Sequence, residues 1–175
     1  MSNPSAVDVG RPALPHLSAE FFVWLWYASE RDGGSMPHGD GIVDVWVEDR
    51  LSFRTPDEDK VRAVMTGENA AASREARAAL ASGKVVRDLQ VHLRNEEREY
   101  TLVLRGVHLD LAGLKLPPHA KDGEEELLYE RMFLYEDVYA VLKSLYRRFA
   151  EERVSAAWSS ETLPAIRRWA EGAPA

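Results

Sequence analysis

The chain has 175 residues, of which 45% are hydrophobic and 29% are charged, a composition typical of one globular domain with a substantial core. Its net charge of −7 excludes general attraction to nucleic acid, so DNA binding would need a local basic patch, an oligomer or a partner. It contains no cysteine, which excludes disulfides, thiol catalysis and cysteine-ligated zinc and fits a reducing compartment.

The N-terminal segment does not have the pattern of a folded element. Residues 1–16 include three prolines and little apolar periodicity, which predicts a flexible tail. This segment lacks the basic start and apolar middle of a secretory signal. No stretch of the chain approaches the roughly 20 apolar residues that span a bilayer. We therefore expect a cytoplasmic protein with a single domain over residues 17–172.

An aromatic-rich helix is predicted over residues 19–31. Ser18 is a candidate N-cap, Glu20 suits the first turn, and Gly33 with Gly34 ends the helix. Aromatic side chains lie around much of this helix, which indicates burial on more than one side. They are Phe21, Phe22, Trp24, Trp26 and Tyr27. Core packing is the favoured interpretation of this cluster, and a partner interface is the alternative.

Period-two alternation predicts a strand over residues 42–47, with its valines on one face and Trp46 alone on the opposite, polar face. An aromatic side chain in that position is a candidate for an interaction surface. Residues 48–50 are interpreted as a turn, and 51–54 as the returning strand of a hairpin. A further short strand is predicted over 61–65.

The centre of the chain carries the clearest β pattern. After a short helix capped by Ser73, apolar and polar residues alternate over 89–93 and again over 100–104. A third strand over 107–111 is expected to break at Gly113. Such alternation indicates an antiparallel sheet with one buried face and one solvated face.

A long helix is predicted over residues 123–153 and a short one over 160–171. Apolar residues recur along the long helix at steps of three and four. Glutamates 124–126 are interpreted as favourable charges at a helix start rather than as a catalytic or metal-binding cluster. We expect the long helix and the helix at 19–31 to pack on one face of the sheet. The predicted fold class is α+β, an antiparallel β-meander packed by an N-terminal helix and a long C-terminal helix.

The chain shows no sequence motif for catalysis or for cofactor binding. Its five histidines lack ligand spacing, and His38 near Asp40 is interpreted as a solvated loop residue rather than a metal ligand. Phosphate-loop, dinucleotide-binding and nucleophile-elbow patterns are not found. We therefore expect a non-enzymatic protein with no metal and no cofactor.

Five basic residues are candidates for contact with DNA. Two of them flank the start of the strand at 89–93, and three fall on the solvated face of the meander. They are Lys84, Arg87, Arg94, Arg105 and Lys115. If the strands pair in order, these side chains form one basic stripe for DNA phosphates. The alternative is a charged outer face that serves only solubility.

Several weak motifs follow one another in a recognisable order over residues 61–150. A short strand precedes a helix that ends in Ala-Ser-Gly-Lys-Val-Val at 81–86, and two strands then lead to Leu-Ala-Gly-Leu-Lys-Leu at 111–116. An acidic stretch next opens a long helix with Glu-Arg-Met-Phe at 130–133. In this order the chain resembles the C-terminal half of the recombination-associated protein RdgC family, and residues 20–26 resemble the helix that opens that half.

This resemblance implies a non-enzymatic protein that binds duplex DNA without sequence preference in recombination or replication. In the family two subunits form a ring around the duplex, and Lys84 and Lys115 are the family-like basic positions. The alternative, favoured by the acidic balance, is an oligomeric protein-interaction or adaptor module that has lost the DNA-binding surface. We expect duplex DNA, a second copy or another protein as partner, and no membrane.

Overall fold

The computed structural model of the chain describes residues 17–55, 61–67, 73–106, 108–118, 120 and 123–175, so the tail predicted over 1–16 lies outside the described residues. In chain order the elements are α1 (Leu17–Arg31), β1 (Ser35–His38), β2 (Gly41–Arg54), β3 (Val61–Thr66), α2 (Arg74–Ala81), β4 (Val85–Asn95), β5 (Arg98–Arg105), β6 (Asp110–Lys115), α3 (Glu124–Val154), the π-helical turn η3 (Trp158–Thr162) and α4 (Leu163–Ala170). The described strands form one antiparallel sheet in the order β1-β2-β4-β5-β6, and β3 also pairs with β2.

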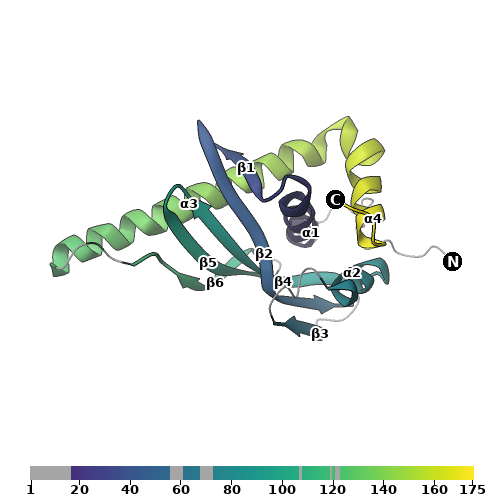
Figure 1. Ribbon diagram of the computed structural model, residues 1–175, viewed down its shortest axis with the longest axis horizontal. Helices are drawn as coiled ribbons and strands as arrows, with labels where there is room; N and C mark the ends of the chain where they lie inside the picture. The colour runs from purple at the N-terminus through teal and green to yellow at the C-terminus, as the bar shows by residue number, and fades with distance from the viewer. Residues whose placement is uncertain (1–16, 56–60, 68–72, 107, 119, 121–122) are drawn as a thin grey trace.

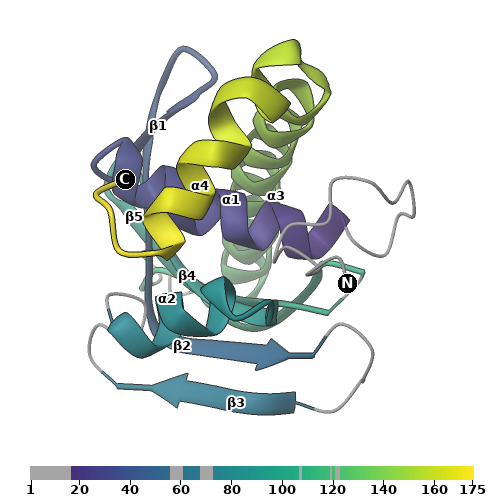
Figure 2. The same ribbon diagram turned by 90° about the vertical axis from the view of Figure 1, so that its right-hand side faces the viewer.

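The helices α1, α3 and α4 lie together on one side of the sheet (Figures 1 and 2). This arrangement confirms the predicted α+β class and the packing of the first and long helices on one sheet face. In the described part of the chain, no helix combines the length and the apolar character needed to cross a membrane.

The helix α1 is the centre of the core. All five aromatic side chains from Phe21 to Tyr27 are at most 5% exposed, which confirms the core interpretation of this cluster. The helix contacts β2 and β4 on one side and α3 and α4 on the other. It begins at Leu17, so the buried Ser18 lies inside the first turn and is not its N-cap, contrary to our expectation. It ends as predicted, with the Gly34 N–H donating to the carbonyl of Ser29 at 2.7 Å.

The strand β2 replaces the predicted hairpin. It runs without a turn from Gly41 to Arg54, pairs with β4 along its length, and pairs with β1 and then β3 on its other edge. Val47 lies opposite Val91 and Leu51 opposite Leu89, so β2 has two more residues than β4 in this interval. The polar residues 48–50 that predicted a turn are therefore accommodated as an irregularity within one long strand.

The predicted meander pairs in order as β4, β5 and β6. The third strand begins at Asp110 rather than 107, after Leu109 with a φ of 57°. Gly113 does not break it. The register with β5 shifts between Thr101 and Val103, and Gly113 takes a φ of 58° there. Glycine adopts a positive φ at little cost, so it forms a bulge and the strand continues to Lys115.

The helix α3 is longer than the sheet that it covers. Its 31 residues span about 46 Å at 1.5 Å per residue. All of its buried side chains lie in the later part, and they are Leu134, Val138, Val141, Leu142, Leu145 and Phe149. The first turns extend beyond the edge of the sheet (Figure 1). The predicted packing of this helix therefore holds from Leu134 onward and not for its first turns.

Candidate interaction surface

Two of the predicted basic residues lie on the outer face of the sheet, at opposite ends of neighbouring strands. Arg94 lies level with Glu99, and Arg105 lies level with Asp88 near the other end of β4. Arg94 Nη2 is 2.8 Å from Asp44 Oδ2, and Arg105 Nε is 3.9 Å from Asp88 Oδ1. Carboxylates from two strands therefore interrupt the stripe that the alternation predicted.

The other three candidates fall into the same two groups. Lys115 ends β6 level with Thr101, on the side of Arg94. Arg87 lies near the start of β4, where its carbonyl accepts from Gly106 N–H at 2.8 Å, beside Arg105. Lys84 precedes that strand and is half-buried. The five basic residues are thus divided between the two ends of the sheet.

Trp46 is covered by its own sheet. Its ring is stacked on His92, with centroids 5.7 Å apart and planes 7° from parallel, and the Arg94 guanidinium lies 5.7 Å from its centroid. Hydrogen bonds from Arg94 and from Ser35 lower the pKa of Asp44. The ionised Asp44 carboxylate in turn holds the Arg94 side chain in this position. Trp46 is therefore part of a local stack on the outer face, and most of its surface is covered.

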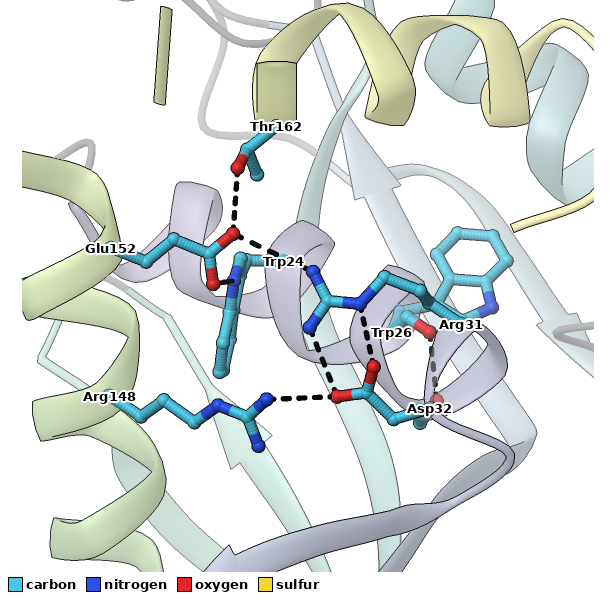
Figure 3. Close-up of polar contacts among 8 residues, drawn as sticks. Trp24, Trp26, Arg31, Asp32, Arg148, Glu152 and Thr162 are labelled. Atoms are coloured by element: carbon cyan, nitrogen blue, oxygen red, sulfur yellow. Dashed lines mark hydrogen bonds and ion pairs between the residues drawn. The ribbon is translucent and has the colours of Figure 1, made fainter. Parts of the chain in front are cut away.

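An extended polar cluster joins the end of α1 to α3 (Figure 3). Asp32 accepts hydrogen bonds from Arg31 Nε at 2.7 Å and from Arg148 Nη2 at 3.1 Å. Partial burial raises the pKa of Asp32, but the hydrogen bonds and charges of Arg31 and Arg148 outweigh it and hold that pKa below its ordinary value. The ionised carboxylate therefore links two helices.

Glu152 forms the second half of this cluster (Figure 3). Its carboxylate accepts from the Trp24 indole at 3.0 Å and from the Thr162 hydroxyl at 2.7 Å, and it lies 3.6 Å from Arg31. Opposite charges are matched, and the buried Trp24 indole finds an acceptor, while Arg148 Nη1 is buried without a hydrogen-bond partner. We interpret the cluster as a cross-link between α1, α3 and η3 rather than as a catalytic site.

The pairing of Asp32 with Arg31 and Arg148, here called the Asp32 clamp, makes the free energy of unfolding depend on pH in a defined direction. Because its folded-state pKa is lowered, the ionised carboxylate stabilises the fold above its unfolded pKa of about 3.9, and this contribution is lost as the pH falls through the lower, folded-state pKa. The difference in unfolding free energy between wild type and Asp32→Asn should therefore be large at pH 7 and shrink below about pH 4. Urea unfolding at a series of pH values measures it, and a difference independent of pH would contradict the clamp.

Exposed apolar side chains gather on the first half of α3. Six of them between residues 128 and 139 are at least 46% exposed. They are Leu128, Tyr129, Met132, Phe133, Tyr135 and Tyr139. Four of the six follow one another at steps of four, three and four, which places them along one side of the helix. We call these four the α3 stripe, defined as Leu128, Met132, Tyr135 and Tyr139.

The α3 stripe leads into an apolar hollow of about 230 Å³. The hollow is formed by α1, β5, the start of β6 and the middle of α3. Its lining residues are Phe21, Leu104, Leu109, Leu111, Tyr139, Leu142, Lys143 and Tyr146. Tyr139 belongs to both the stripe and the hollow, so the two form one continuous apolar surface.

Contacts to the turn between β4 and β5 hold this half of α3 in place. Asp137 accepts hydrogen bonds from the Tyr100 hydroxyl at 2.5 Å and from Asn95 Nδ2 at 3.0 Å. Burial and the neighbouring carboxylate of Asp137 raise the pKa of Tyr100. The Arg98 guanidinium lies 3.2 Å from Asp137 and 4.9 Å from the centroid of the Phe133 ring. The α3 stripe is thus carried by a helix that is anchored to the sheet.

Sequence reasoning assigned the residues of the α3 stripe to the core and so missed this surface. The signal that could have revealed this surface is the wide angular spread of the apolar residues in this part of α3. Tyr129 and Phe133 project from a different side of the helix than Leu128 and Met132, whereas a half-buried helix carries apolar residues on one side only.

Comparisons with protein-family models, with curated proteins and with solved structures give no match in any of the three. Within the described ranges, no three His, Asp or Glu side chains are grouped as a metal site would require. The function of this chain is therefore inferred from the geometry of its own surface.

Proposed function

We propose that this chain is a non-enzymatic protein-interaction module and that the α3 stripe with the adjoining hollow is its contact surface. The observation that carries this proposal is the group of six large apolar side chains, at least 46% exposed, on one half of one helix. Single exposed apolar residues are ordinary on protein surfaces, but a contiguous group marks a site of association.

The shape of this surface favours a helical partner. Apolar residues at alternating steps of three and four form the seam by which two helices pack side by side. A helix laid along such a seam covers it with its own apolar side, as in complexes where an amphipathic helix fills a groove. The hollow at the end of the stripe then accommodates one further apolar side chain.

Site-specific photo-crosslinking in cells tests this function. A photoreactive phenylalanine analogue is placed at Tyr135 or Tyr139, and as a control at Ile42, which is 63% exposed on the sheet. We expect both α3 positions to give adducts with defined protein segments, identified by mass spectrometry, and the control to give none. Equal adducts at the three positions, or none at any, would contradict the proposal.

Sequence-independent binding of duplex DNA is the second candidate function, and one observation favours it. Arg54, Arg87 and His108 line one hollow of about 200 Å³, beside the first turn of α1 and together with Asp110. Arginines and the positive end of a helix dipole both attract phosphate. Binding in this mode uses phosphate contacts and does not read the bases.

The DNA hypothesis has a salt-dependent signature. With three to five basic contacts, log K should fall against log salt with a slope of roughly −3 to −5. Changing both Lys84 and Arg87 to Glu, at the end of the sheet that carries this hollow, should flatten that slope and remove most of the binding, because each reversed charge repels a phosphate. Thermal stability should change little, since charge substitutions away from the core usually cost little.

A matched control reverses two exposed arginines on other elements, Arg74 and Arg168, and should leave the slope unchanged. Two results would contradict the DNA hypothesis. One is no measurable binding at low salt, and the other is binding that the reversal of Lys84 and Arg87 does not alter.

A further inference from the structure

The spacing of the α3 stripe is complementary to itself. When two α3 helices run antiparallel with their centre between Met132 and Tyr135, Leu128 of one copy comes level with Tyr139 of the other. One turn further along, Met132 of the first copy comes level with Tyr135 of the second. The two-fold axis between the helices repeats both of these pairs. Leu128 then lies at the mouth of the apolar hollow, which Tyr139 borders. Two-fold pairing of this kind closes on itself.

The charges of α3 select the antiparallel direction. Its first turn carries three glutamates, Glu124, Glu125 and Glu126, whereas Lys143 and Arg147 are exposed further along. In the antiparallel register Glu125 of one copy lies beside Lys143 of the other, on the same side of the seam, and the pair occurs twice. A parallel pairing would instead bring the glutamates of both copies together and align the two helix dipoles.

The exposed apolar area fits a weak dimer of two such chains. The four side chains of the α3 stripe, each about half exposed, offer roughly 400 Å² per chain when a fully buried aromatic contributes about 200 Å². Two copies together would bury about 800 Å² from the stripe alone, the size of a weak, reversible interface.

We propose that the partner of the α3 stripe is a second copy of this chain, bound through antiparallel pairing of the two α3 helices. This inference rests on the proposed function and names its partner. Leu128 and Tyr139 face each other across the seam, and Glu125 pairs with Lys143 at both ends.

Crosslinking through introduced cysteines tests the direction and the register, because the natural chain contains no cysteine. Leu128→Cys and Tyr139→Cys variants are prepared separately and treated with a short bis-maleimide, either alone or mixed. We expect covalent dimers in the mixture and few in either variant alone. Dimers formed efficiently by Leu128→Cys alone would indicate parallel pairing and overturn the proposed register.

Sedimentation equilibrium tests the association itself. We expect the wild-type chain to be dimeric at tens of micromolar and Met132→Glu to associate at least tenfold more weakly. The control Ile42→Glu, an exposed apolar residue on the sheet, should remain dimeric. Lys143→Glu should weaken association, and Glu125→Lys in the same chain should restore it, which a loss of folding would not allow.

Failure of this inference and failure of the proposed function give different results. A wild-type chain that stays monomeric up to several hundred micromolar overturns the second-copy proposal. The proposed function would still stand if photo-crosslinking at Tyr135 captured a segment of another protein. Unchanged association in Met132→Glu would likewise overturn the second-copy proposal, because its dimer would then not use the α3 stripe.

Discussion

Replacing Phe149 with Ala should lower the free energy of unfolding by about 3–5 kcal/mol. Phe149 is 1% exposed, and its ring contacts those of Phe21, Trp24 and Trp158 at centroid distances of 5.5–5.9 Å. These neighbours come from α1 and η3, so truncation leaves a cavity where three elements meet. Urea unfolding followed by tryptophan fluorescence measures the loss.

Two further truncations along α3 provide the control for Phe149. Leu142 is 9% exposed at the edge of the hollow, so Leu142→Ala should cost about 2 kcal/mol, at the low end for a buried leucine. Tyr139 is 57% exposed, and Tyr139→Ala in dilute protein should cost less than about 1 kcal/mol. Equal losses at Tyr139 and Phe149 would contradict the distinction between the exposed α3 stripe and the buried side of the same helix.

Replacing Glu152 with Ala should destabilise the fold by roughly 2–4 kcal/mol. The Trp24 indole is fully buried and the Thr162 side chain is nearly so, and both would lose their acceptor. A buried donor without an acceptor carries the full cost of its desolvation. Arg31 would also lose one of its two carboxylate partners.

The neighbouring residue provides a matched control. Glu151 is exposed on the same turn, and Glu151→Ala should change the unfolding free energy by less than about 0.5 kcal/mol. Glu152→Gln keeps one acceptor oxygen and should fall between the two. If Glu151→Ala and Glu152→Ala were equally destabilising, the loss would reflect helix propensity and not the buried cluster.

Periodicity predicted the elements whose hydrophobic pattern is local. The strands β4 and β5 and the helix α3 follow from spacing, because each carries a periodic apolar side, whereas α1 follows from its continuous apolar run between a polar start and two glycines. The strand β2 did not, since its polar residues 48–50 have the composition of a turn. Pairing with β4 on either side of residues 48–50, and with β3 from Arg50 onward, holds this segment extended, and no local pattern records that pairing.

The candidate surfaces required non-local information. Alternation correctly placed Arg94 and Arg105 on the exposed side of their strands, but the partners of these arginines, Asp44 and Asp88, depend on strand register. For α3 the spacing predicts an apolar side without showing how far the sheet extends beneath it. The sequence therefore could not distinguish exposed Met132 from buried Leu145.

The oxidation rate of Met132 tests most directly whether the α3 stripe is an association surface. Met132 is 51% exposed in the single chain, and Met36 is fully buried and serves as an internal control for folding. Exposed methionines are oxidised by dilute peroxide faster than buried ones. We predict that Met132 is oxidised rapidly in dilute purified protein and several-fold more slowly in intact cells, with Met36 slow in both. Equally rapid oxidation of Met132 in both settings would contradict the account, because the stripe would then have no partner.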